Sequence, residues 1–197
     1  MRAAVLVAPG RFETRDAQDP EPGPEDVIVR VARCGICGTD LHIFDGHYSA
    51  DKLPLIPGHE IVGGVERVGA AVTDLAPGDR VVVDNAIGCG RCFYCRRNEI
   101  LNCPEMVQLG IHVDGGFAER VRVPARLALP IPDGMPFDLA ALTEPLACVV
   151  RAQKKIGLAL GESVLVIGGG PIGNLHAQLA RLLGAAPVIV AELNPAR

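Results

Sequence analysis

The sequence has no excess of basic residues, no long run of charges of one sign and no long apolar run. Its 19 basic and 23 acidic side chains give a net charge of −4 and a pI near 5.7, which argues against a nucleic-acid-binding face or a basic membrane patch. No stretch approaches the roughly 20 apolar residues of a transmembrane helix. The apolar run before Pro9 is too brief for a secretory signal and predicts an opening strand.

The residues that are abundant predict a folded protein with two kinds of structure. Hydrophobic residues make up 49% of the chain and charged residues 21%, which is enough apolar material for a globular core and excludes low-complexity disorder. Residues 1 to about 130 contain short valine-rich runs, such as Val27–Val31 and Arg80–Val83, separated by glycine and proline. Short strands with turn signals between them predict an irregular β-barrel or sandwich.

The pattern changes after Pro136. Leu146–Ile156 has the apolar spacing of a helix. Ser163–Ile167 is a continuous apolar run typical of a buried parallel strand, and Val188–Ala191 predicts a second strand. The amphipathic stretch between them completes a βαβ unit. We therefore predict a first, mainly β domain over 1–150 and the start of a second, α/β domain over 151–197. Since one βαβ unit needs further strands and covering helices, we expect the second domain to be incomplete.

Four of the seven cysteines lie close together, at Cys89, Cys92, Cys95 and Cys103, with the spacing C-x2-C-x2-C-x7-C. In the absence of a secretory signal this cluster favours metal binding over disulfides, and we expect a cytoplasmic protein. Four thiolates suit the closed tetrahedral shell of a structural zinc, and Gly88 and Gly90 allow the necessary turns. An iron–sulfur cluster is the alternative, but the ferredoxin pattern has three residues before its last cysteine, whereas here there are seven.

A second group of candidate metal ligands comes earlier in the chain. Cys37 lies in the segment Cys34–His42, and His59 and Glu60 follow the turn Pro57–Gly58. A thiolate, an imidazole and a carboxylate are the ligand mixture of an open catalytic zinc site, in which one position accepts water or substrate. A thioredoxin-like reading of Cys34 and Cys37 is disfavoured, because such motifs sit beside a βαβ unit and this one lies among short strands.

The motifs G-x-C-G-T-D-x-H, G-H-E and C-x2-C-x2-C-x7-C, in that order, resemble those of the zinc-containing medium-chain alcohol dehydrogenases. With Glu144-Pro145-Leu146 and a later glycine turn, the chain is most similar to the sorbitol and threonine dehydrogenase branch. The resemblance covers essentially the whole chain. It implies a GroES-like irregular β-barrel followed by a Rossmann domain, two zinc ions per chain, NAD as cofactor, and full-length relatives that are homo-oligomers. Such relatives continue beyond Arg197.

The resemblance also implies roles for individual residues. Cys37, His59 and Glu60 would be ligands of the catalytic zinc, and Glu144 would be an acid close to that metal. Cys148 is the rival fourth ligand, although it is expected, like Cys34, to be a buried inert thiol. Thr39 would hydrogen-bond the substrate hydroxyl, and His42 would pass its proton towards solvent, for which the titration range of histidine is suitable.

A glycine turn follows the strand that is predicted to end at Ile167. Residues 168–173 satisfy G-x-G-x-x-G between a predicted strand and a predicted helix, which is the context that supports dinucleotide binding. Glu192 lies 19 positions after Gly173, where an acid would hold the ribose hydroxyls and favour NAD over NADP. The candidate cofactor-binding residues are Gly168, Gly170, Pro171, Ile172, Gly173 and Glu192.

The sequence thus predicts a zinc-dependent oxidoreductase that transfers hydride from a secondary alcohol, polyol or hydroxy-amino acid to NAD. We expect no nucleic-acid or membrane partner. The alternative is a non-catalytic zinc-binding fragment of such a dehydrogenase. The zinc-free quinone reductases are a third possibility, against which the ligand set argues.

Overall fold

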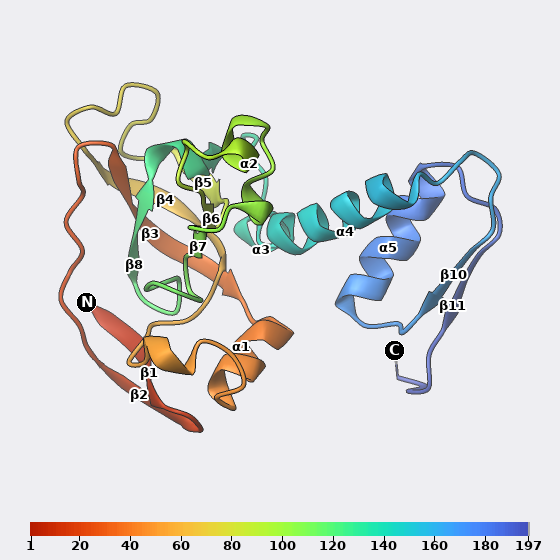
Figure 1. The fold of residues 1–197 in the computed structure, drawn as a ribbon, viewed down its shortest axis with the longest axis horizontal. Coiled ribbons are helices and arrows are strands. Elements are labelled where there is room, and N and C mark those ends of the chain that lie inside the picture. Colours follow the sequence, from red (N-terminus) through yellow and green to blue (C-terminus); the bar gives the residue numbers. More distant parts are fainter. Residues whose placement is uncertain (197) are drawn as a thin grey trace. The chain divides into compact units, whose positions relative to one another are not determined.

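The computed structural model describes residues 1–196, and it divides into two compact units, Met1–Leu142 and the residues from Thr143 onward (Figure 1). The boundary predicted at residue 150 falls inside a helix. The division at 142/143 keeps that helix, α4 (Thr143–Ile156), whole and together with α5 (Pro171–Leu182), on which it packs. No helix among residues 1–196 is long and apolar enough to cross a bilayer.

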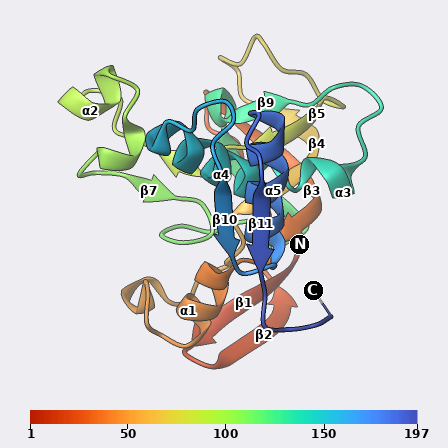
Figure 2. The ribbon, with the colours of Figure 1, turned by 90° about the vertical axis from the view of Figure 1, so that its right-hand side faces the viewer.

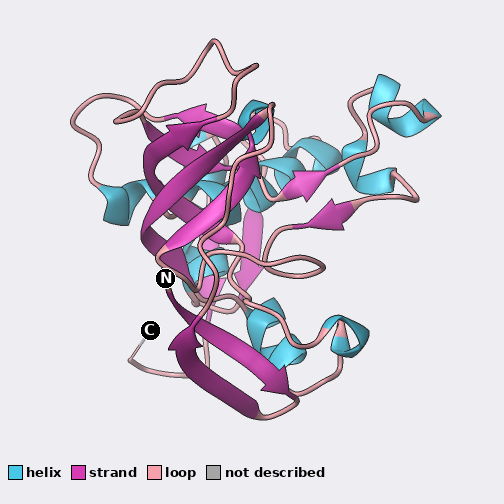
Figure 3. Cartoon of the chain, turned by 90° about the vertical axis from the view of Figure 1, so that its left-hand side faces the viewer, coloured by secondary structure: helices cyan, strands magenta, loops and turns pink. Residues whose placement is uncertain are grey.

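The first unit is built mainly of strands joined by loops (Figure 3). Its largest sheet has five antiparallel strands in the order β8-β3-β4-β5-β9. These strands are β3 (Asp26–Gly35), β4 (Glu60–Val68), β5 (Arg80–Val83), β8 (Arg120–Pro124) and β9 (Ala128–Pro130). The short strands predicted for this region are confirmed, and within residues 1–196 their pairing stays open rather than closing into a barrel.

Valines and isoleucines of these strands form the main core of the first unit. Val27 and Val29 of β3 are two residues apart and therefore lie on the same face of the strand, where both are fully buried. They pack in one cluster with Ile61 of β4, Val81 of β5 and Val123 of β8. The core thus fixes β3 and β4 side by side, and both candidate catalytic loops adjoin these two strands.

Two smaller strand pairs and short helices complete the first unit. The predicted opening strand is present as β1, which pairs with β2. A second pair, β6 with β7, adjoins the cysteine-rich loop and its helix α2, and in Figure 2 α2 and β7 lie away from β3, β4 and β5. The bounds are β1 (Arg2–Ala8), β2 (Arg11–Asp16), β6 (Ala86–Ile87), β7 (Val107–Gln108), α1 (Gly38–Phe44), α2 (Phe93–Arg96) and α3 (Phe137–Ala140). Single 3-10 turns cover Ala50–Lys52, Ile100–Asn102 and Ala125–Leu127.

The second unit contains the predicted βαβ arrangement. β10 (Val164–Ile167) and β11 (Val188–Ala191) pair in parallel, with Val164 opposite Val188, and α5 connects them. The prediction that the strand at Ser163–Ile167 is buried was wrong for Leu165 and Ile167, which are exposed, as is Ile189 of β11. A single βαβ unit covers only part of its sheet surface, which accounts for this exposure.

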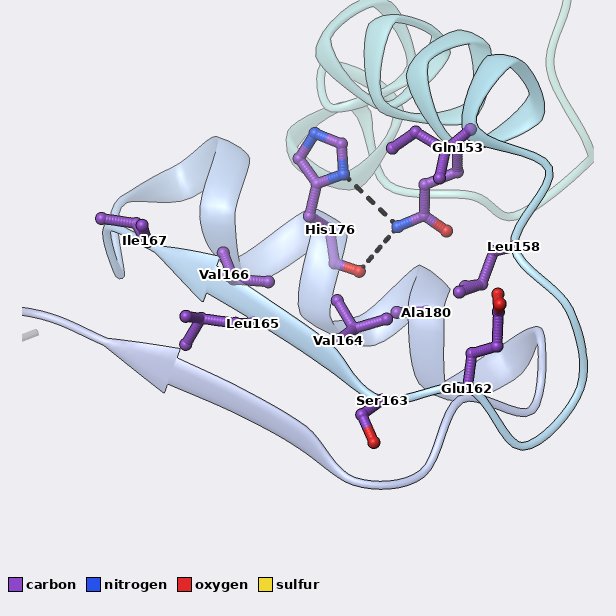
Figure 4. Close-up of a pocket in the computed structure, with 11 residues that line it drawn as sticks. Gln153, Leu158, Glu162, Ser163, Val164, Leu165, Val166, Ile167, His176 and Ala180 are labelled. Carbon is purple, nitrogen blue, oxygen red and sulfur yellow. Dashed lines mark hydrogen bonds between the residues drawn. The ribbon is translucent and has the colours of Figure 1, made fainter.

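A pocket of about 620 Å³ lies in the second unit, lined by residues of α4, α5 and β10 (Figure 4). Across it, Nε2 of Gln153 donates to the backbone oxygen of His176 at 2.8 Å and lies 3.3 Å from Nδ1 of the same residue. The side chain of Gln153 is buried, and its contact with His176 links α4 to α5.

Candidate metal centres and glycine turn

The loop between β6 and β7 brings the four clustered cysteines together. The Sγ atoms of Cys89, Cys92, Cys95 and Cys103 all lie within 4.8 Å of one another. Cys92 caps α2, and its Sγ accepts the N–H of Cys95 at 3.4 Å. Gly90 has φ +75°, and a Cβ on Gly88 would lie 2.8 Å from Sγ of Cys95. Both glycines are therefore required, Gly90 by its backbone conformation and Gly88 by the space that the sulfur occupies.

The environment of these thiols suits a cation. Backbone N–H groups of Arg91 and Cys92 point at the sulfur of Cys89 and lower the pKa of its thiol to about 6. Removal from water and the neighbouring thiols raise the pKa of Cys95 to about 12, and its sulfur lies 3.9 Å from that of Cys89. Four thiolates this close repel one another unless a cation lies between them. The residues present thus fit a tetrahedral zinc ion.

The second cluster lies where β3 ends and β4 begins. Cys37 caps the start of α1, just after β3, while His59 and Glu60 are adjacent residues at the start of β4. One ligand atom from each of these residues lies within 4.8 Å of the other two. The first two predicted ligands come from loops 22 positions apart that the pairing of β3 with β4 brings together. Three donors, a thiol, an imidazole and a carboxylate, are one fewer than a tetrahedral zinc ion takes, which is the ligand number of an open zinc site.

Asp40 connects the two loops that carry these ligands. It is the acid of the motif G-x-C-G-T-D-x-H, but no role was predicted for it. Its side chain is only 4% exposed, one oxygen accepts the backbone N–H of Cys37 at 2.8 Å, and the other accepts that of Gly58 at 3.3 Å. The second oxygen also lies 3.5 Å from Nδ1 of His59. A buried carboxylate so placed orients the ligands around it. The sequence signals for it are its place in that motif and its position three residues after a helix-capping residue.

His59 is buried beside this carboxylate. Burial on its own lowers the pKa of the imidazole, but Asp40 and the nearby Cys37 outweigh that effect and raise the pKa to about 9. Nδ1 of His59 makes no hydrogen bond within the described residues. Without a metal, the ring thus carries a proton that a bound cation would displace.

The remaining predicted residues of this site are placed as follows. Thr39 lies in the first turn of α1, and its Oγ1 is 3.8 Å from Sγ of Cys37. His42 is exposed in the last turn of the same helix, and its part as a proton relay stays a prediction. Glu144 lies in the first turn of α4, in the second unit, and its part as a ligand stays a prediction.

The two other cysteines differ from each other. Burial, followed by the charge of Asp40, raises the pKa of Cys34 to about 12, as expected of an inert thiol. Cys148 was expected to be a core residue as well, but in the structure it is exposed on α4, so this expectation was wrong. The buried face of α4 contains Val149, the next residue along the chain. The pattern of apolar residues did not show which of the two side chains faces the core.

Gly35 is needed for the position of Glu60, because the two residues face each other across the β3–β4 pair. A Cβ on Gly35 would lie 1.8 Å from Oε2 of Glu60.

We expect Gly35→Ala to fold, since a carboxylate can rotate away, but to weaken metal binding at this cluster by at least about tenfold, as loss of correct ligand orientation does. Gly38→Ala is the matched control, since a Cβ there meets nothing within 4 Å. Cobalt(II) titration followed by visible absorbance measures both, and equal affinities would contradict the argument.

The glycine turn joins β10 to α5 with the geometry predicted for it. Gly168 has φ +104°, α5 begins at Pro171, and a Cβ on Gly173 would lie 1.9 Å from the oxygen of Gly168. The first glycine is thus required by its backbone conformation and the third by close packing. Glu192 follows β11, and its carboxylate accepts the N–H groups of Gly169 at 2.7 Å and Asn194 at 2.8 Å. Glu192 and the turn are therefore in direct contact.

Comparison with known proteins agrees with this geometry. The alcohol dehydrogenase GroES-like domain matches residues 23–133, which include both candidate metal clusters. The chain belongs to this family. The GroES-like domain is followed by the glycine turn, which lies beyond the matched residues.

Similar proteins in this family include L-threonine 3-dehydrogenase of Chelativorans sp. strain BNC1, 41% identical over 90% of this chain and 52% of that protein. D-arabinitol dehydrogenase 1 of Uromyces fabae is 39% identical over 97% of this chain and 54% of that protein. A protein assigned to the zinc-binding dehydrogenases of Sinorhizobium meliloti 1021, crystallised with NADP, is 42% identical, with a TM-score of 0.95 over 99% of this chain and 57% of that one. The chain spans about half the length of the curated relatives it matches.

Proposed function

We propose that this GroES-like domain and the βαβ unit after it belong to a zinc-dependent dehydrogenase that oxidises a secondary alcohol, polyol or hydroxy-amino acid with NAD. The observation that carries the proposal is the convergence of Cys37, His59 and Glu60 within 4.8 Å, next to the hydroxyl of Thr39. The relatives named for threonine and arabinitol indicate the class of substrate, a compound with a secondary hydroxyl.

The chain's own residues would have distinct parts in this reaction. Cys37, His59 and Glu60 would hold a zinc ion, whose Lewis acidity would lower the pKa of the substrate hydroxyl. The Thr39 hydroxyl accepts the proton of the substrate hydroxyl and gives up its own proton to His42. His42, exposed at the end of α1, releases it to solvent. The hydrogen on the substrate carbon can then leave as hydride to the nicotinamide.

The four-cysteine cluster would hold a second, structural zinc. Its donors are all thiols and leave no open position, so it contributes to folding rather than to the reaction. Unpaired thiols held for zinc favour a reducing compartment, for which we propose the cytoplasm. We also propose that the full-length protein is a homo-oligomer and binds small molecules rather than nucleic acids or membranes.

For the cofactor we propose NAD, bound at a Rossmann-type turn by residues 168–173 and Glu192. The carboxylate of Glu192 lies against the turn and would repel a 2′-phosphate. The Sinorhizobium relative was crystallised with NADP, so the preference of this chain for NAD over NADP needs a direct measurement. We expect NADH to bind at least about tenfold more tightly than NADPH, the difference being removed in Glu192→Ala. Fluorescence titration measures both, and tighter binding of NADPH to the unaltered chain would contradict the assignment.

The activity is tested by following the absorbance of reduced cofactor after adding NAD and a panel of secondary alcohols, polyols and L-threonine. Because the chain spans about half the length of its relatives, the alternative is a zinc-binding portion that turns nothing over by itself. Zinc content of two per chain without turnover, together with turnover of a chain extended to the relatives' length, would favour that alternative. Absence of zinc would contradict both and favour the zinc-free quinone reductases.

A further inference from the structure

Two hydrogen bonds hold consecutive peptide groups of the glycine turn. The N–H of Gly169 donates to Oε2 of Glu192 at 2.7 Å, and the carbonyl oxygen of Gly169 accepts from Nδ2 of Asn174 at 2.6 Å. Nδ2 of Asn174 also lies 3.3 Å from the carbonyl oxygen of Gly170. Asn174 lies just outside the G-x-G-x-x-G pattern, in the first helical turn of α5, so the pattern gives it no part.

Each bond fixes a different peptide plane. Glu192 holds the plane between Gly168 and Gly169, while Asn174 holds the plane between Gly169 and Gly170. The second plane is trans, so its carbonyl oxygen and its N–H point in opposite directions. By binding the oxygen of Gly169, Asn174 directs the N–H of Gly170 away from its own side chain, towards the open side of the turn.

Without these bonds the turn would be poorly fixed. Three successive glycines have more backbone freedom than any other tripeptide, and ordering them costs conformational entropy. The Gly168 end is fixed by its N–H, which donates to the oxygen of Ala191 at 2.7 Å, and by the contact of its oxygen with Gly173. The side chains of Glu192 and Asn174 fix the plane on each side of Gly169.

We propose that Asn174 is a positioning residue for dinucleotide binding, which acts by keeping the turn in its phosphate-binding arrangement before the cofactor arrives. This inference rests on the proposed function, because it takes the turn as the site of the cofactor's pyrophosphate. A preformed turn binds more tightly because less ordering remains to be done on binding. Asn174 acts through the Gly169 carbonyl and has no direct contact with the cofactor in this scheme.

The test uses Asn174→Ala and Asn174→Leu, which both remove the donor, the second at similar volume. Gln178→Ala is the matched control, because Gln178 is an exposed amide one turn further along the same helix. In NMR spectra of the cofactor-free chain, the amide signals of residues 168–170 should broaden or shift in both Asn174 variants and stay unchanged in Gln178→Ala. Unchanged signals in either Asn174 variant would overturn the proposal.

NADH titration provides the second measurement. Both Asn174 variants should bind NADH about three- to tenfold more weakly than the unaltered chain, the factor expected for loss of one hydrogen bond, with the same melting temperature. Equal NADH affinity, or a loss confined to Asn174→Ala, would overturn the proposal. If the unaltered chain and a form extended to the relatives' length both fail to bind NADH, the proposed function fails instead, and the amide signals still decide the role of Asn174.

Discussion

Cys103→Ala is expected to reduce the zinc content from two ions per chain to one and to lower the free energy of unfolding by at least about 3 kcal/mol, because loss of a metal is among the largest effects of one substitution. Cys103 is only 6% exposed, and it closes the cluster from the end of the turn Ile100–Asn102, while the other three thiols come from the loop around α2. Without it, the loop between β6 and β7 loses the ion that joins its two ends.

The measurement combines metal quantification with denaturant unfolding. Cys148→Ala is the control, since Cys148 is exposed on α4 of the second unit and removing it should leave both ions and the stability unchanged. The same variant examines the alternative that Cys148 is a ligand, which predicts one ion fewer. If Cys103→Ala kept two zinc ions and its unfolding midpoint, the four cysteines would not form a zinc site.

What the sequence could predict is local in the chain. The four cysteines lie within one loop, so their spacing alone limits how far apart the sulfurs can be. The strand–turn–helix order around residues 168–173 is likewise a short-range pattern, and the structure contains it at nearly the predicted bounds. The domain boundary was less predictable, because the helical pattern of α4 does not reveal that this helix packs on α5.

The residues that sequence reasoning missed act across the fold. Gly35 is the first glycine of the motif G-x-C-G-T-D-x-H, but its role follows from the register of β3 with β4, which sets it opposite Glu60 and which the motif does not reveal. Asp40 matters because its carboxylate meets two backbone N–H groups that are 21 positions apart in the chain. Asn174 bonds a carbonyl of the preceding turn, which depends on the turn's conformation. Such contacts follow from the folded geometry and leave no regular spacing in the sequence.

Asp40→Ala is expected to weaken metal binding at the Cys37, His59 and Glu60 cluster by about 10- to 100-fold, the usual cost of removing a group that orients metal ligands. The carboxylate accepts the backbone N–H of Cys37 and that of Gly58, and it faces the ring of His59. Its loss removes the bond that joins both loops and leaves the N–H groups of Cys37 and Gly58 without this acceptor. Asp40→Asn keeps the volume and one acceptor oxygen, so its effect should be smaller and of the same sign.

Cobalt(II) titration separates this effect from general damage to the fold, because the four-cysteine cluster in the same chain serves as an internal reference. Its affinity should be unchanged in both Asp40 variants, since the hydrogen bonds of Asp40 are made to the loops of the other cluster. Asp45→Asn is the matched control, as Asp45 is an exposed acid at the opposite end of α1. If Asp40→Ala bound cobalt at both clusters as tightly as Asp45→Asn does, Asp40 would only cap the helix. A graded loss, larger for alanine than for asparagine and confined to one cluster, is what a ligand-orienting carboxylate requires.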